Sequence, residues 1–216
     1  MHCRKSISIG LSLSLFCWLA PVNAQQVNEY NLAAMLQKGQ LITTPANQTK
    51  ALENSLPGAV STKGMVWLKD MAFKQGTIDI DLRGKNVFLQ SFLGIAFHGT
   101  DSSAYDLVYF RPFNFRYPDT ARRRWSVQYV SEPDFSWDKL RKEHPLVYEN
   151  SVTPIPEPDQ WFHATIDVKD GWVTVYVNHS DKPSLRVHLL NNKNAGGLAL
   201  WDDELSGDFA GLTITR

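Results

Sequence analysis

Residues 73–82 read Phe-Lys-Gln-Gly-Thr-Ile-Asp-Ile-Asp-Leu, and from residue 78 onward their apolar and acidic side chains alternate. In an extended backbone, Ile78 and Ile80 point to one face while Asp79 and Asp81 point to the other. A period of two residues predicts a β-strand with one face in the core and one face in solvent. Such half-buried strands are typical of antiparallel sheets.

The same period of two residues recurs further along the chain, at residues 161–168 and 172–177. Other apolar runs add strand candidates at 65–68, 92–97, 105–113, 125–130, 185–190, 197–201 and 211–215. Helical patterns are confined to residues 31–39 and 136–142, and no strand-helix-strand rhythm recurs. The pattern predicts an all-β protein, a two-sheet antiparallel jelly-roll sandwich with one or two short helices.

Length and composition limit the function classes. A chain of 216 residues suits one domain. Its 43% hydrophobic and 12% aromatic residues can form a packed core, which excludes intrinsic disorder. Because 22 basic residues balance 22 acidic ones, the chain is not a polycation that coats nucleic acid, and no nucleic-acid partner is expected.

Residues 1–24 have the features of a signal peptide. A basic pair at 4–5 precedes an apolar run at 7–20, and small residues at 22–24 suit cleavage before Gln25. The apolar run is too short to cross a bilayer comfortably. We therefore expect a secreted or periplasmic protein with no stable membrane span.

Both cysteines, Cys3 and Cys17, lie in this leader, so the mature chain is expected to lack disulfides and cysteine-ligated zinc. We expect residues 25–64 to form an N-terminal extension with a short helix and the first strands. Residues 65–216 are then the sandwich domain. Within it, residues 131–160 contain five prolines, which predicts an excursion over the surface.

Three motifs carry a resemblance to a known superfamily. Residues 73–81 fit the pattern F-x-x-G-x-I-x-x-D, residues 197–201 read G-L-A-L-W, and residues 207–214 fit G-x-F-x-x-L-x-I. Over residues 65–216 the chain thereby resembles concanavalin A-like lectin/glucanase jelly rolls, which include laminin-G-like modules and exported 3-keto-disaccharide hydrolase-type domains of unknown function. The resemblance implies the sandwich fold. It leaves the activity open, because this superfamily contains lectins, enzymes and binding modules.

No catalytic motif is recognisable. Laminarinase-type members of the superfamily carry Glu-x-Asp-x-x-Glu on one strand, and this run is absent here. Asp79 and Asp81 come nearest to it, and we interpret them as the solvated face of a strand. Gly-x-Ser-x-Gly, His-Glu-x-x-His and phosphate-binding glycine patterns are also absent. If the protein is an enzyme, we expect a glycoside hydrolase or lyase, with candidate acid/base residues Asp106, Glu132, Tyr109 and His98.

The candidate binding residues gather in and after residues 105–116, Tyr-Asp-Leu-Val-Tyr-Phe-Arg-Pro-Phe-Asn-Phe-Arg. On a strand, Tyr105, Tyr109, Arg111 and Phe113 would share one face. Aromatic planes stack on sugar rings, and guanidinium and amide groups bind hydroxyls or carboxylates. A hairpin with residues 125–130 would add a glutamine, and the full candidate set is Tyr105, Tyr109, Arg111, Asn114, Arg124, Gln128 and Trp137.

Five arginines lie between positions 111 and 124, namely Arg111, Arg116, Arg122, Arg123 and Arg124. They predict a locally cationic site, which favours anionic or modified glycans. In the alternative interpretation the aromatic residues belong to the core, and the arginines pair with Asp106 or Glu132.

The resemblance also implies a structural calcium ion, since several superfamily members bind one at the rim of the sandwich. We nominate Asp208 as its side-chain ligand, with backbone carbonyls completing the site. The alternative is that Asp208 caps a turn. No other cofactor is expected.

Three functions remain open at this point. The first is an exported carbohydrate-binding jelly roll whose partner is a glycan or glycoconjugate. The second is a glycan-active hydrolase or lyase with the same fold, and the third is a laminin-G-like protein-interaction module. The sequence leaves the oligomeric state open.

Overall fold

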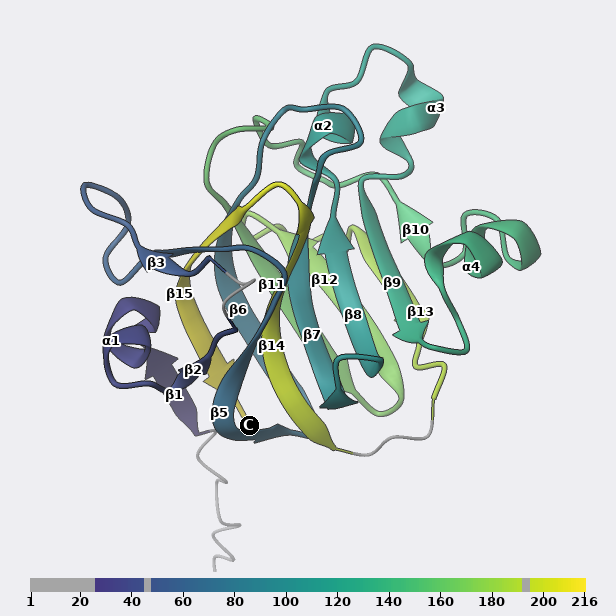
Figure 1. Cartoon of the computed structure of the whole chain (residues 1–216). Coiled ribbons are helices and arrows are strands. Elements are labelled where there is room, and N and C mark those ends of the chain that lie inside the picture. Colours follow the sequence, from purple (N-terminus) through teal and green to yellow (C-terminus); the bar gives the residue numbers. More distant parts are fainter. Residues whose placement is uncertain (1–25, 45–47, 192–194) are drawn as a thin grey trace, which may run out of the picture.

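The computed structural model describes residues 26–44, 48–191 and 195–216, which form two antiparallel sheets packed face to face (Figure 1). The expected all-β jelly-roll sandwich is confirmed. The expected signal peptide, residues 1–24, lies outside the described residues.

Sheet A contains residues 76–82, where apolar and acidic side chains alternate. In spatial order it consists of β13 (Leu185–His188), β12 (Trp172–Val177), β11 (Phe162–Lys169), β6 (Gly76–Arg83), β15 (Gly207–Thr215), β4 (Val60–Thr62) and β3 (Lys50–Ala51). β1 (Val27–Tyr30) also pairs with β15. As predicted, Ile78 and Ile80 are fully buried on the inner face of β6, while Asp79 and Asp81 on the outer face are partly exposed.

Sheet B forms the second layer and carries the site described below. Its strands, in spatial order, are β10 (Glu149–Asn150), β9 (Val127–Glu132), β8 (Ala104–Phe110), β7 (Ser91–Asp101), β14 (Gly196–Glu204), β5 (Met65–Phe73) and β2 (Leu41–Ile42). The predicted hairpin partners β8 and β9 are adjacent, and Tyr109 lies opposite Gln128.

The described part of the expected N-terminal extension belongs to the sandwich. β1 and β4 both pair with β15 in sheet A, and β2 pairs with β5 in sheet B. Residues before position 65 thus supply strands to both layers.

Both predicted helices are present as α1 (Leu32–Gln37) and α4 (Trp137–Glu143). The side chain of Asn31 caps α1 by accepting a hydrogen bond from the Ala34 N–H at 2.9 Å. Within the described residues, α2 (Pro112–Phe115) and α3 (Thr120–Arg123) are additional single turns, and no helix in that part of the chain has the length and apolarity to span a membrane.

The predicted strand 105–113 is too long, because β8 ends at Phe110. Pro112 occupies the first turn of α2, where its fixed φ suits a helix and its missing N–H costs nothing. Phe113 therefore leaves the strand face that we predicted and packs edge-on against Phe88 and Phe92.

Apolar residues also cover the outer face of sheet B, away from the main core. Ala96, Leu107, Tyr109 and Ala199 are buried there together with Leu140 of α4. The predicted excursion 131–160 places α4 on this face and then returns to the edge of the sheet as β10. The segment turns the outer face of sheet B into a sheltered surface.

Candidate functional site

A cavity of about 380 Å³ opens on this outer face of sheet B. Five aromatic side chains line it, namely Phe92, Tyr105, Tyr109, Trp137 and Trp201. Five charged side chains line it as well, namely Arg111, Glu132, Arg141, Asp203 and Glu204. Neighbouring strands β9, β8, β7 and β14 and the helix α4 supply these groups, except Arg111, which directly follows β8.

Strand register explains how the aromatic wall forms. Gly94 of β7 lies opposite Tyr109 of β8 on one side and opposite Trp201 of β14 on the other. A Cβ at Gly94 would lie 2.0 Å from the Val108 carbonyl oxygen, so only glycine fits there. Because no side chain separates them, the Tyr109 and Trp201 rings meet edge to face with centroids 5.3 Å apart.

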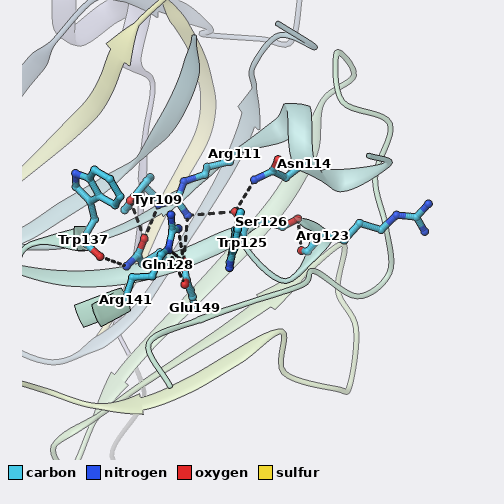
Figure 2. Close-up of polar contacts among 10 residues, drawn as sticks. All are labelled: Tyr109, Arg111, Asn114, Arg123, Trp125, Ser126, Gln128, Trp137, Arg141 and Glu149. Atoms are coloured by element: carbon cyan, nitrogen blue, oxygen red, sulfur yellow. Dashed lines mark hydrogen bonds and ion pairs between the residues drawn. The ribbon is translucent and has the colours of Figure 1, made fainter. Parts of the chain in front are cut away.

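A hydrogen-bonded network forms the floor of the cavity (Figure 2). The Tyr109 hydroxyl donates to Gln128 Oε1 at 2.9 Å, and the Arg111 guanidinium donates to both of these oxygens. Arg111 Nη1 also donates to the Trp125 carbonyl at 3.1 Å. The Gln128 amide donates to the Trp137 carbonyl at 3.3 Å, which fixes the first turn of α4 over β9.

One buried carboxylate pairs with both guanidinium groups of the cavity. Arg141 Nε donates to both oxygens of Glu149, at 2.9 and 3.2 Å, and Arg111 Nη1 lies 3.8 Å from Glu149 Oε2. The Arg141 guanidinium in turn stacks over the rings of Trp125 and Trp137, at 4.6 and 5.2 Å from their centroids. The position of Trp137 is thus set by an ion pair and by stacking.

Burial shifts the proton affinities of the groups around the cavity. It raises the pKa of Tyr109 to about 12, with Arg111 opposing the shift, and it lowers the pKa of the Arg111 guanidinium. Burial also raises the pKa of Glu132, and the charge of Asp138 adds to this effect. Tyr109 therefore stays protonated at neutral pH and acts as a neutral hydrogen-bonding group.

The structure brings together four of the seven predicted binding residues. Tyr105, Tyr109, Arg111 and Trp137 all line the cavity. Gln128 lies fully buried in the floor network and does not itself line the cavity. Asn114 and Arg124 lie outside it, and Asn114 donates to the Trp125 carbonyl at 2.9 Å.

The expected roles of three of these residues need correction. We expected Tyr109 to supply a stacking plane and Arg111 and Gln128 to supply hydrogen bonds to one sugar ring. Tyr109 and Arg111 are only 4% and 5% exposed, and the polar atoms of all three bond to one another. They support the cavity from below, while Trp137, which is 50% exposed, offers an accessible ring.

The predicted cationic site does not form, because the five arginines diverge. Arg111 is the one that lines the cavity. Arg116 pairs with Glu157 at 2.9 Å on the surface, and Arg122 stacks among Phe88, Tyr117 and Trp125. Arg123 donates to the Tyr117 carbonyl at 2.7 Å. The turns α2 and α3 spread these side chains around one end of the sandwich.

The four candidate acid/base residues fall on two faces of sheet B. Glu132 and Tyr109 line the cavity, whereas Asp106 and His98 are buried on the inner side, so our expectation of one shared groove is wrong. Asp106 alternates with Tyr105 along β8 and therefore points the opposite way. Its carboxylate contacts His98 Nδ1 at 2.8 Å and accepts a hydrogen bond from the Tyr129 hydroxyl at 2.7 Å.

Asp79 and Asp81 lie on the outer face of sheet A, whereas the cavity lies on sheet B. His163 of β11 lies beside them, with Nδ1 2.9 Å from Asp81 and Nε2 3.3 Å from Asp79. Although burial opposes the shift, these carboxylates raise the pKa of His163 to about 9, and it carries a positive charge at neutral pH. The pair is thus neutralised in part by a histidine, which agrees with our interpretation of a structural strand face.

Asp208 lies in β15 and not in a turn. Its carboxylate accepts a hydrogen bond from Arg83 Nε at 2.9 Å, across the β6–β15 pair. Among the described residues no cluster of three or more histidine, cysteine, aspartate or glutamate side chains is arranged to hold a metal ion. Calcium binding at Asp208 stays a prediction from the resemblance alone.

Sequence reasoning missed several residues that line the cavity. The most important are Trp201, Asp203 and Glu204 of β14, Phe92 of β7 and Arg141 of α4. Trp201 belongs to the G-L-A-L-W motif. This motif indicated the fold, but it did not indicate which residues would lie next to Trp201. The pairing of β14 with β7 brings it to the cavity.

Comparisons with known proteins agree with this architecture. No protein-family profile and no curated protein matches the chain. The carbohydrate-binding module CBM66 from Bacillus subtilis superposes with a TM-score of 0.56 at 12% identity, over 80% of this chain and 94% of that one. At this identity the likeness establishes the fold.

Two more distant structures are similar as well. A Bacillus subtilis protein of unknown function with a galectin-like fold has a TM-score of 0.47 at 9% identity, over 89% of each chain. A Bacillus licheniformis β-glucanase has a TM-score of 0.43 at 11% identity, over 82% of each chain. The superposition on the carbohydrate-binding module, together with the two antiparallel sheets, shows the concanavalin A-like sandwich fold that the motifs predicted.

Proposed function

We propose that this chain is an exported carbohydrate-binding protein and that the cavity on sheet B holds a sugar ring. The observation that carries the proposal is the combination of accessible aromatic rings with polar groups in one cavity. Trp137 and Trp201 line it from α4 and from β14, and Glu132 and Asp203 lie among them. Aromatic planes suit the apolar face of a pyranose or furanose, and carboxylates accept hydrogen bonds from its hydroxyls.

The size and rigidity of the cavity support this proposal. A volume of about 380 Å³ falls within the range of small-molecule sites. The floor network and the Arg141–Glu149 ion pair hold the walls in place before any ligand arrives. Because little side-chain freedom is lost on binding, such a preformed site binds more tightly than a flexible one.

The sequence predicted anionic or modified glycans, and the charges around the cavity disfavour the anionic ones. Glu132, Asp203 and Glu204 line it, whereas its two guanidinium groups both pair with Glu149. With Glu149 included, four carboxylates face two guanidinium groups, so an anionic sugar would meet an excess of negative charge. Neutral sugars, or sugars with an amino group, fit this arrangement better.

A glycan array tests the proposal. The array carries glucan, fructan, mannan, xylan, chitin and uronan oligosaccharides, each as a series from the monosaccharide to the hexasaccharide. We expect binding to a neutral or amino-sugar series. Binding to the uronan series alone would overturn the charge argument, and binding to no glycan would favour the protein-interaction alternative.

Hydrolysis is a second candidate function, favoured by one observation. Glu132 lines the cavity with a raised pKa, as a general acid requires, and Asp203 lines the same cavity from β14. Prolonged incubation with the bound oligosaccharide, followed by product analysis, decides the matter. Cleavage that is lost in a Glu132→Gln variant supports an enzyme, whereas an intact oligosaccharide supports a binding protein.

Export is proposed from the leader alone. We expect the protein isolated from its natural source to begin at Gln25, with residues 1–24 removed. Intact-mass measurement checks this directly. A mass that includes the leader would contradict export by a cleaved signal peptide.

A further inference from the structure

A second hollow, of about 420 Å³, opens on the outer face of sheet B, over β5 and β14. Trp67 of β5 borders it and lies opposite Ala199 of β14, while Met65, two residues earlier, lies opposite Trp201. Side chains two residues apart on a strand share a face. Trp67 and Trp201 are therefore diagonal neighbours on one face, and the backbone positions of such a pair lie roughly 7–8 Å apart.

Two glycines fix the position of the Trp67 indole. A Cβ on Gly99 would lie 2.1 Å from the ring, and a Cβ on Gly197 would lie 2.9 Å from it. The indole thus occupies the space that side chains at these positions would fill. The strand register also shifts beside Gly197, against both β5 and β7, which gives the backbone its irregular shape under the ring.

The Trp67 ring remains partly exposed and borders the hollow. Ile42, 49% exposed, extends the apolar surface beside it, and Asp70 and Thr100 supply polar groups at its border. The hollow therefore repeats the chemistry of the cavity: an aromatic plane held in place by the sheet, with hydrogen-bonding groups around it. Trp201, which lines the cavity, is the diagonal neighbour of Trp67.

We propose that Trp67 forms a second sugar-binding position, which holds a further unit of the same glycan whose first unit occupies the cavity. The inference rests on the proposed function and adds to it that the ligand is an oligosaccharide that runs across β8, β7, β14 and β5. Trp67 and Trp201 pack against the same buried cluster on the outer face of sheet B, which supports this occupant. Because the two tryptophans are diagonal neighbours on adjacent strands, we expect a chain of a few sugar units to reach both rings.

Titration calorimetry with the neutral or amino-sugar series selected by the array tests the proposal. For the wild-type protein we expect affinity to rise about tenfold from the monosaccharide to the longer oligosaccharides. A Trp67→Ala variant should lose this rise and keep the monosaccharide affinity. Trp67→Phe retains an aromatic plane and should recover part of it. Trp172→Ala on the outer face of sheet A is the matched control and should behave as wild type.

The outcomes separate this inference from the proposed function. Equal affinity for the monosaccharide and the longer members in the wild-type protein would overturn the second position while leaving the cavity as a binding site. This outcome needs no variant, so the second position can be refuted even if Trp67→Ala does not fold. Absence of binding to every series would overturn the proposed function itself and the second position with it.

Discussion

Replacing Trp137 with alanine is expected to lower glycan affinity about thirtyfold, the effect of losing an aromatic contact worth about 2 kcal/mol. The ring is half exposed on α4, lines the cavity and contacts Arg141, which Glu149 holds independently. The melting temperature should therefore change little, because the ring is not part of the main core. Calorimetric titration and thermal unfolding of the same sample measure both quantities.

The control for this variant is Trp172→Ala, since Trp172 lies in β12 on the outer face of the opposite sheet. We expect its glycan affinity to equal that of the wild-type protein. If Trp137→Ala and Trp172→Ala bind equally well, the cavity is not where the sugar binds. A loss of affinity in both would point instead to a general change in the fold.

Replacing Asp106 with alanine is expected to reduce the free energy of unfolding by about 3–5 kcal/mol, because it leaves buried polar partners unsatisfied. His98 is buried and donates from Nε2 to the Lys74 carbonyl at 2.7 Å, so its Nδ1 depends on Asp106. Tyr129 would lose its acceptor too. For a domain of this size the melting temperature should fall by roughly 6–20 °C.

The same Asp106→Ala variant tests whether Asp106 has a catalytic role. Because its side chain points away from the cavity, the folded fraction should bind glycan with wild-type affinity. Any hydrolysis seen in the wild-type protein should also persist in that fraction. An unchanged melting temperature together with lost turnover would contradict the structural role given to Asp106 here.

The fold followed from local patterns in the sequence. Successive side chains of a strand point to opposite faces, so the alternation along residues 73–82 was enough to predict that Ile78 and Ile80 are buried. The hairpin of β8 and β9 is also local, and it correctly placed Tyr109 opposite Gln128. The predicted strand should have ended before Pro112, since a proline often begins a new element.

The site was harder to predict because it depends on pairings between distant segments. Trp201 reaches the cavity only because β14 pairs with β7, which places it opposite Gly94. Arg111 can be buried because β10 pairs with β9 and brings Glu149 to within 3.8 Å of its guanidinium. The residue types indicated that aromatic and guanidinium groups lie near one another. The register of the strand pairs determines which of these side chains remain accessible to a ligand.

A crystal structure with the tightest-binding oligosaccharide of the array would show whether the cavity on sheet B binds the sugar. We expect a sugar ring against Trp137 and Trp201, with hydroxyls near Glu132 or Asp203. A ring bound instead on the outer face of sheet A, beside Trp172, would show that this cavity is not the sugar site.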